Sequence, residues 1–208
     1  MQAFTTLTAT ACPLPLQGVD TDQLVPARFM GRTREEGYGG VLLHDLRFDA
    51  AGQPAPGFPL NQRPGSAILV ARRNFGAGSS REAAVYALMD YGVRCVLAPS
   101  FGDIFAANAV NNGLLPARLG EADTECLLDI LQAGLHELTV NLHTCRVHAG
   151  AEAWDFTLDP VSRTKLLNGW DDLDLTASHA AAIAAFAASD ASARPWMPPL
   201  AREAPTRV

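Results

Sequence analysis

The sequence has no cluster of basic residues. Among its 208 residues, 16 Lys and Arg are outnumbered by 22 Asp and Glu, and the net charge is −6. Proteins bind nucleic acid duplexes through a concentrated positive surface that neutralises phosphates. We therefore expect no nucleic-acid partner. A small anionic substrate remains compatible with this charge, because binding it takes only a few local cations.

Long hydrophobic runs are also absent. The apolar stretch at 179–188 is too short to cross a bilayer, which takes about 20 residues. The start of the sequence has no basic segment followed by an apolar one, as a secretory signal would have. We expect no membrane association and, by default, a cytoplasmic protein.

Cysteine is sparse, and no two of the four cysteines are close in sequence. Zinc and iron–sulfur sites are commonly built from closely spaced cysteines, such as CxxC pairs. Neither pattern occurs around Cys12, Cys95, Cys126 or Cys145. The sequence thus predicts free thiols and no metal bound by this chain.

The composition is that of a globular protein, with 48% hydrophobic and 18% charged residues. Short apolar runs typical of strands alternate with segments of helical spacing, which favours an α/β fold with helices flanking a mixed sheet. We expect strands at 66–71, 93–98, 138–142, 145–149 and 154–158. We expect helices at 81–91, 104–110, 122–133, 160–167 and 176–188.

The first 65 residues are rich in glycine and proline and show little periodicity, so we expect them to be mostly loop. Two long loops are expected at 31–40 and 50–65. Loops of this length in a compact domain usually serve a function. We place a single domain at 1–190 and a proline-rich tail at 191–208.

The segment 74–82 (NFGAGSSRE) connects an expected strand to an expected helix. Gly76 and Gly78 allow close backbone approach, and N–H groups at a helix start favour an anion. Ser79 and Glu82 have the spacing of a capping box, and Arg81 offers a planar fork for a carboxylate. By spacing alone, the segment is either an anion-binding loop or an ordinary capped helix start. It has neither of the common glycine-rich nucleotide motifs.

Six motifs occur in one order: VDTDQLVP (19–26), NFGAGSSRE (74–82), DYG (90–92), APSFGDIF (98–105), NNGLLP (111–116) and LLNGWDD (166–172). Together they resemble the small-subunit family of the 3-isopropylmalate dehydratases, which is the swivel domain of the aconitase superfamily. The likeness extends from about residue 19 to about residue 186.

This resemblance implies an aconitase-like swivelling β/β/α domain and a hydro-lyase that is active only with a large subunit. That subunit would carry a [4Fe–4S] cluster whose iron acts as the Lewis acid, so this chain itself would bind no cofactor. The partners would be the large subunit, in a heterodimer, and a small hydroxy-diacid substrate that loses and regains water.

The resemblance also implies roles for individual residues. Ser79 matches the serine that, as an alkoxide, removes the substrate proton, and Arg81 matches the arginine that binds a substrate carboxylate. Ser80 and Gly78 match neighbouring substrate contacts. Asp22 matches an active-site aspartate, although an Asx-turn would explain it equally well.

Arg34 lies in the segment 31–43, where the family carries a further substrate arginine and where its substrate choice is assigned. The alternative for Arg34 is a solvated loop arginine. The sequence does not decide which residues of this segment would contact a substrate.

Three positions depart from the family pattern. Ala77 and Ala83 stand where a cysteine and a histidine are usual, and Ala27 stands where a lysine is usual. Three functions therefore remain open. The chain could serve the interconversion of 2- and 3-isopropylmalate in leucine biosynthesis. It could serve a sibling dehydratase of the citramalate/citraconate, homoaconitate or dimethylmalate type. It could also be an inactive swivel domain with an assembly role.

Overall fold

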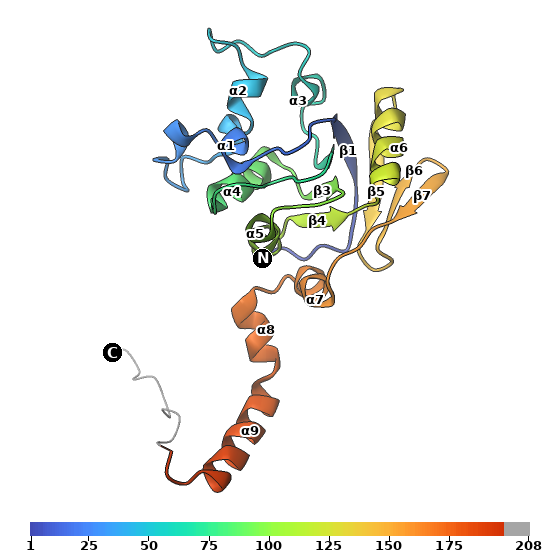
Figure 1. Ribbon diagram of the computed structural model, residues 1–208. Helices are drawn as coiled ribbons and strands as arrows, with labels where there is room; N and C mark the ends of the chain where they lie inside the picture. The colour runs from blue at the N-terminus through green and yellow to red at the C-terminus, as the bar shows by residue number, and fades with distance from the viewer. Residues whose placement is uncertain (198–208) are drawn as a thin grey trace. The chain divides into compact units, whose positions relative to one another are not determined.

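The computed structural model describes residues 1–197, which form two compact units, Met1–Trp170 and a second unit that begins at Asp171. The first unit is built on a mixed seven-stranded sheet with the strand order β4-β3-β2-β1-β5-β6-β7 (Figure 1). The expected fold class is therefore confirmed. The strands are β1 (Thr6–Leu14), β2 (Ile68–Ala71), β3 (Cys95–Ala98), β4 (Leu115–Arg118), β5 (Glu137–Asn141), β6 (Arg146–Ala149) and β7 (Glu152–Asp155).

The long strand β1 joins a parallel half of the sheet to an antiparallel half. Its carboxyl-terminal part pairs in parallel with β2, with Ala11 opposite Ile68. Its amino-terminal part pairs antiparallel with β5, with Thr6 opposite Asn141. The strands β2, β3 and β4 continue the parallel half, and β6 and β7 continue the antiparallel half.

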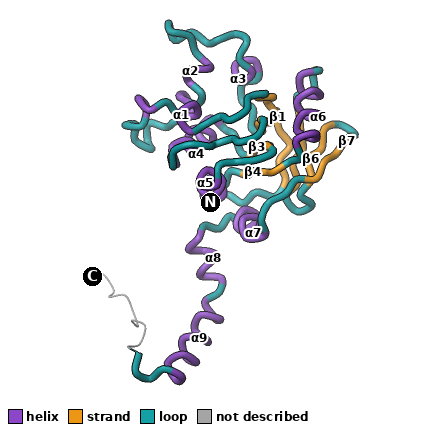
Figure 2. Tube along the Cα trace, viewed as in Figure 1, coloured by secondary structure: helices purple, strands orange, loops and turns teal. Residues whose placement is uncertain are grey.

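The expectation that the first 65 residues are mostly loop is wrong for β1. Proline is rare in central strands because it cannot donate to the ladder. However, the pairing of β1 with β5 ends at Thr10. At Pro13, β1 is therefore paired with β2 alone. The rest of this region is loop broken by short helical turns, as Figure 2 shows. These are α1 (Thr21–Leu24), η1 (Ala27–Phe29), η2 (Gly39–Val41), α2 (His44–Arg47) and α3 (Pro59–Gln62).

The longer helices of the first unit lie where the periodicity predicts them. They are α4 (Glu82–Tyr91), α5 (Asp103–Asn112), α6 (Glu121–Gln132) and α7 (Pro160–Asn168). Left-handed glycines end three of them, at Gly92, Gly113 and Gly169. Glycine adopts this conformation at little cost and is the usual stop signal of a helix.

Apolar cores cover both faces of the sheet, because side chains alternate along each strand. Along β2, Leu69 belongs to one core, which includes residues of α4, whereas Ile68 and Val70 belong to the other, which includes residues of α6. This burial on both faces explains why β2 reads as an uninterrupted apolar run rather than an alternating one.

The second unit contains α8 (Asp172–Ser178) and α9 (Ala180–Ala193). We expected one helix at 176–188, but His179 has φ −98° and ψ 11° and separates the two. The expected domain end at residue 190 falls inside α9, and most of the expected tail, 198–208, lies outside the described residues. Within residues 1–197, no helix is long and apolar enough to span a membrane.

Candidate active site on the serine loop

The serine loop, which we define as residues 74–81, follows the carboxyl end of β2 and leads into α4. In open α/β sheets, ligands bind beyond the carboxyl ends of parallel strands. The neighbouring parallel strand β3 ends at the same edge, and its following segment, 99–102, lies beside the serine loop. The fold therefore places the predicted site residues at the edge where a ligand site is expected.

Three hydrogen bonds fix the start of the serine loop to the segment after β3. The backbone N–H groups of Asn74 and Phe75 donate to Ser100, to Oγ at 2.8 Å and to the carbonyl oxygen at 3.0 Å. The N–H of Gly102 donates to the carbonyl of Phe75 at 2.9 Å. Asn74 itself is left-handed, with φ 64°, a conformation that asparagine tolerates better than most residues.

Gly76 is required by close packing at this point. Its φ is +72°, and a Cβ there would collide with the ring of Phe105. The rings of Phe75 and Phe105 pack edge to face with centroids 5.5 Å apart. The aromatic residues of the motif thus form a rigid base under the serine loop.

A second set of bonds fixes the serine loop to the segment around α1. The N–H of Gly76 donates to Val19 O at 2.7 Å, and the N–H of Thr21 donates to Ala77 O at 2.9 Å. The hydroxyl of Thr21 donates to Ser79 O at 2.9 Å. Two of the motifs, 19–26 and 74–82, are therefore one structural unit.

The capping box expected between Ser79 and Glu82 does not form. The helix α4 begins at Glu82 with Arg81 as its N-cap, and no side chain caps it. The Glu82 carboxylate instead accepts a hydrogen bond from Asn112 at 2.9 Å. Ser79 precedes the N-cap by two residues, which leaves its side chain outside the first turn.

As a result, the two serines are exposed rather than used in capping. Among the described residues, none accepts a hydrogen bond from the N–H groups of Ser79, Ser80 or Arg81. These donors lie at the amino end of a ten-residue helix, whose dipole favours negative charge. The serine loop can therefore stabilise an anion.

Arg81 forms an ion pair with Asp22, the first carboxylate of α1. The Arg81 side chain is 20% exposed and that of Asp22 is 51% exposed. The paired nitrogen, Nη1, is buried and makes no well-directed hydrogen bond, and the described residues give the rest of the guanidinium no partner. Arg81 therefore keeps N–H donors that no described residue uses and that a carboxylate ligand could accept. The structure brings Asp22, Gly78, Ser79, Ser80 and Arg81 together.

Arg34 bonds to α4 rather than to the serine loop. Its Nη1 and Nη2 donate to the two carboxylate oxygens of Asp90 at 2.5 and 2.8 Å. Its guanidinium also lies over the Tyr86 ring, 4.2 Å from the centroid. The N–H of Tyr38 donates to the same Asp90 carboxylate at 2.8 Å. Arg34 therefore fastens the 31–40 segment to α4, and its charge is already paired.

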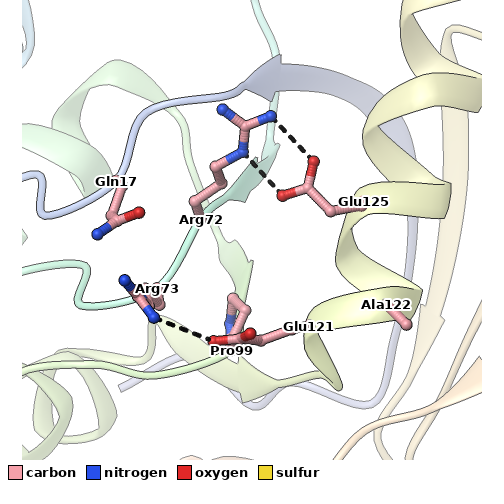
Figure 3. Close-up of a pocket in the computed structure, with 7 residues that line it drawn as sticks. All are labelled: Gln17, Arg72, Arg73, Pro99, Glu121, Ala122 and Glu125. Atoms are coloured by element: carbon pink, nitrogen blue, oxygen red, sulfur yellow. Dashed lines mark hydrogen bonds and ion pairs between the residues drawn. The ribbon is translucent and has the colours of Figure 1, made fainter.

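A surface pocket of about 420 Å³ opens next to the start of the serine loop, and the sequence did not predict it (Figure 3). Both arginines of the pocket are paired with carboxylates of α6. Arg72 donates two hydrogen bonds to Glu125, at 2.8 and 2.9 Å, and Arg73 Nη1 lies 3.8 Å from Glu121 Oε1. Ser79 and Arg81 do not line it. The pocket lining is Gln17, Arg72, Arg73, Pro99, Glu121, Ala122 and Glu125.

Metal-binding side chains are scattered over the described part of the chain. Within residues 1–197, no group of three or more His, Cys, Asp or Glu side chains is placed to hold a metal. Cys12 and Cys95 belong to different cores. Burial raises the pKa of the Cys12 thiol to about 12, although nearby Arg63 lowers it in part. A thiol with so high a pKa is a poor source of the thiolate that metals bind.

Three comparisons with known proteins show the family to which this chain belongs. A family model described as the aconitase C-terminal domain matches residues 1–122. The 3-isopropylmalate dehydratase small subunit of Shewanella baltica (strain OS185) is 47% identical over 194 residues, covering 89% of this chain and 96% of the relative. That of Rhodospirillum centenum is 44% identical over 200 residues, covering 94% and 98%.

A solved structure shares the fold. The crystal structure of 3-isopropylmalate dehydratase from Methanocaldococcus jannaschii aligns with a TM-score of 0.62 at 22% identity, covering 86% of this chain and 98% of that one. At this identity the structural match shows the fold alone, so the family assignment rests on the more similar sequence relatives. The chain therefore belongs to the aconitase C-terminal domain family and, within it, to the small subunits of 3-isopropylmalate dehydratase.

Proposed function

We propose that this chain is the small subunit of a heteromeric 3-isopropylmalate dehydratase, a hydro-lyase that interconverts 2- and 3-isopropylmalate in leucine biosynthesis. The observation that carries the proposal is the identity of 43–47% to small subunits of that name over 89–95% of the chain. The complete Ser79-Ser80-Arg81 sequence on an exposed, anion-stabilising loop supports it.

In this proposal Ser79 is the base. Its deprotonated oxygen takes the proton from the substrate carbon next to the one that bears the hydroxyl, and the hydroxyl leaves as hydroxide, which the Lewis acid of the large subunit would accept. To form the other isomer, the proton returns to the carbon that lost the hydroxyl and hydroxide adds to its neighbour. A serine hydroxyl is too weakly acidic to do this unaided. The unpaired N–H groups of the serine loop and the positive charge of Arg81 would stabilise the anion.

The remaining residues bind the substrate. The free edge of the Arg81 guanidinium would hold one carboxylate through two parallel hydrogen bonds. Ser80 and Gly78 would contact the same group from the exposed face of the serine loop. Asp22 would orient Arg81 through their ion pair. Arg34 retains a role in binding only if a substrate replaces Asp90 as its partner.

A large subunit would complete this site. Ser79 and Ser80 are exposed to solvent, whereas proton abstraction from carbon needs water to be excluded. The names of the relatives as small subunits support a larger partner. The scattered cysteines support placing the [4Fe–4S] cluster on that partner, in a heterodimer that we expect to be cytoplasmic.

A sibling dehydratase is the alternative that Ala77 and Ala83 raise, although the names of the relatives do not favour it. Ala83 is 7% exposed and packs in the apolar core, so this chain has no imidazole at the first turn of α4. Such a change alters the surroundings of the Ser79 base without removing it. The intact serine and arginine argue against an inactive swivel domain.

The test is reconstitution with the cognate large subunit under anaerobic conditions. The complex would be assayed with 2-isopropylmalate, citramalate, homocitrate and dimethylmalate at equal concentrations. We expect the highest kcat/KM for isopropylmalate and no turnover by either subunit alone. Turnover of another diacid in its place would assign the chain to a sibling enzyme. A folded, cluster-loaded complex that is inactive on all four would contradict the proposal.

A further inference from the structure

We propose that Thr21 is a positioning residue for the serine loop, and that its hydroxyl sets the orientation of the peptide between Ser79 and Ser80. The role rests on the proposed function of the serine loop. Thr21 is 1% exposed, and its Oγ1 donates to the carbonyl oxygen of Ser79 at 2.9 Å. A buried hydroxyl is costly unless it is bonded, and this bond satisfies it.

The serine loop needs such an anchor because it contains two glycines just before Ser79. Gly76 and Gly78 have φ of +72° and +99°, and glycine rotates between conformations more freely than any other residue. The N–H of Thr21 fixes the start of this stretch, through Ala77 O at 2.9 Å. Asp22 fixes its end, through Arg81. Between these points, the Thr21 hydroxyl is the contact that holds Ser79 among the described residues.

The bond has a consequence for the opposite edge of the peptide. A trans peptide is planar, so its C=O and N–H point in opposite directions. With the carbonyl of Ser79 held toward the buried Thr21, the N–H of Ser80 must point away from α1. Ser79 and Ser80 are both exposed, so this N–H is directed to the open side of the loop, where an anion would lie.

Loss of the Thr21 hydroxyl would release this constraint. The peptide could then rotate about the axis through the Cα atoms of Ser79 and Ser80 and present a carbonyl oxygen where the N–H donor stands. A carbonyl oxygen repels an anion, so the Ser79 alkoxide would be destabilised. Arg81 would keep its ion pair with Asp22 and could still hold a substrate carboxylate. The expected signature is therefore a fall in kcat with little change in KM.

Matched variants separate this role from stability. Thr21→Val removes the hydroxyl and keeps the shape, and Thr21→Ser keeps the hydroxyl. Thr124→Val is the control, because Thr124 is also fully buried and its Oγ1 also donates to a carbonyl at 2.9 Å, that of Gly120. Thr124 lies on α6 and makes none of the serine-loop contacts.

The kinetic experiment uses the complex with the large subunit and whichever hydroxy-diacid the wild-type complex turns over. We expect Thr21→Val to lower kcat by roughly 10- to 100-fold with KM changed less than about threefold. We expect Thr21→Ser to stay within about threefold of the wild type and Thr124→Val to keep full activity.

A second readout needs no substrate. In the full isolated chain, hydrogen exchange of the Thr21 and Gly76 amides reports the bonds to Ala77 O and Val19 O. We expect both amides to exchange about tenfold faster in Thr21→Val than in Thr124→Val. If the wild-type complex prefers a diacid other than isopropylmalate, the proposed substrate is wrong, while the Thr21 variants still test the positioning role on the preferred diacid.

Several results would overturn the positioning role. It fails if Thr21→Val keeps wild-type kcat, if Thr21→Ser loses as much activity as Thr21→Val, or if the two amides exchange alike in Thr21→Val and Thr124→Val. Should Thr21→Val fail to fold, Thr21→Ala removes the hydroxyl with less crowding. A fully active Thr21→Ala complex would contradict the proposal in the same way.

Discussion

Asp22 on α1 forms an ion pair with Arg81, the N-cap residue of α4, and this pair links two motifs that are distant in sequence. The pair occupies Nη1 of the guanidinium, and no described residue bonds to its other nitrogens. We therefore expect Asp22 to orient Arg81 for ligand binding more than to stabilise the fold. The carboxylate of Asp22 is half exposed, so water screens the pair and its contribution to stability is small, which makes the two effects separable.

Asp22→Asn should therefore weaken catalysis while it leaves stability nearly unchanged. Without its charged partner, Arg81 is free to turn from the serine loop, and we expect kcat/KM of the reconstituted complex to fall about tenfold. Asp155→Asn is the control, because it removes the carboxylate of another exposed pair, with Arg146 at 2.9 Å. Equal kinetic effects of the two variants would argue against the orienting role of Asp22.

Arg81→Lys should be far more damaging than its retained charge suggests. An ammonium cannot form the two parallel bonds that a guanidinium makes with a carboxylate. We expect kcat/KM to fall by roughly 10²- to 10⁴-fold, measured as initial rates of the complex. Arg146→Lys, on β6, should have no effect. Near-normal kinetics of Arg81→Lys would show that Arg81 does not bind the substrate.

The pair between Arg34 and Asp90 makes the stability of the 31–40 segment sensitive to acid. Burial alone would raise the pKa of Asp90, but hydrogen bonds from Arg34 and from the Tyr38 N–H outweigh it and hold the pKa below its usual value. The stabilisation is therefore complete above the ordinary aspartate pKa of about 4 and is lost as pH falls through the lower folded value.

Urea unfolding at a series of pH values tests this coupling. Asp90→Asn should be less stable than the wild type at pH 7, and the difference should shrink as the pH falls below about 4. Glu35→Gln is the control, since Glu35 is an exposed carboxylate of the same segment with no bonded partner in the described chain. A stability difference that stays constant down to pH 2 would contradict the assignment.

Arg63 joins the end of α6 and the residues after it to β1, and we expect it to affect folding but not catalysis. Its guanidinium donates to Leu131 O at 2.5 Å, to Leu135 O at 2.8 Å and to Ala11 O at 2.8 Å, which ties the end of α6 to β1. Arg63→Ala leaves these carbonyls without the charged donor, and we expect a loss of about 2–4 kcal/mol in the free energy of unfolding. Arg146→Ala, at an exposed pair, should change it by less than about 0.5 kcal/mol. A similarly small effect of Arg63→Ala would rule out this structural role.

The centre of the parallel half was predictable from sequence, because apolar runs, helical spacing and glycine stops agree there. Both β2 and α4 lie within two residues of their expected bounds. The strand β4 was not predicted, since Pro116 lies inside it. It occurs at the edge of the sheet, where a missing donor is tolerated. Local sequence does not show which strand will be at an edge.

The members of the site were predictable from motifs, whereas their contacts were not. The bond between Thr21 and Ser79 joins residues 58 apart, and that between Arg34 and Asp90 joins residues 56 apart. A single sequence contains no signal for such pairs. The capping box failed for a related reason: the spacing of Ser79 and Glu82 permits it, but contacts with Thr21 and Asn112 take its place.

The rate of the Ser79→Ala complex tests the central claim most directly. The variant should assemble with the large subunit and bind isopropylmalate, because Arg81 and the N–H donors of the loop remain. Without the base, kcat should fall by at least about 10³-fold while KM changes little. A Ser79→Ala complex that turns over isopropylmalate at the wild-type rate would contradict the assignment of the serine loop as this chain's part of the active site.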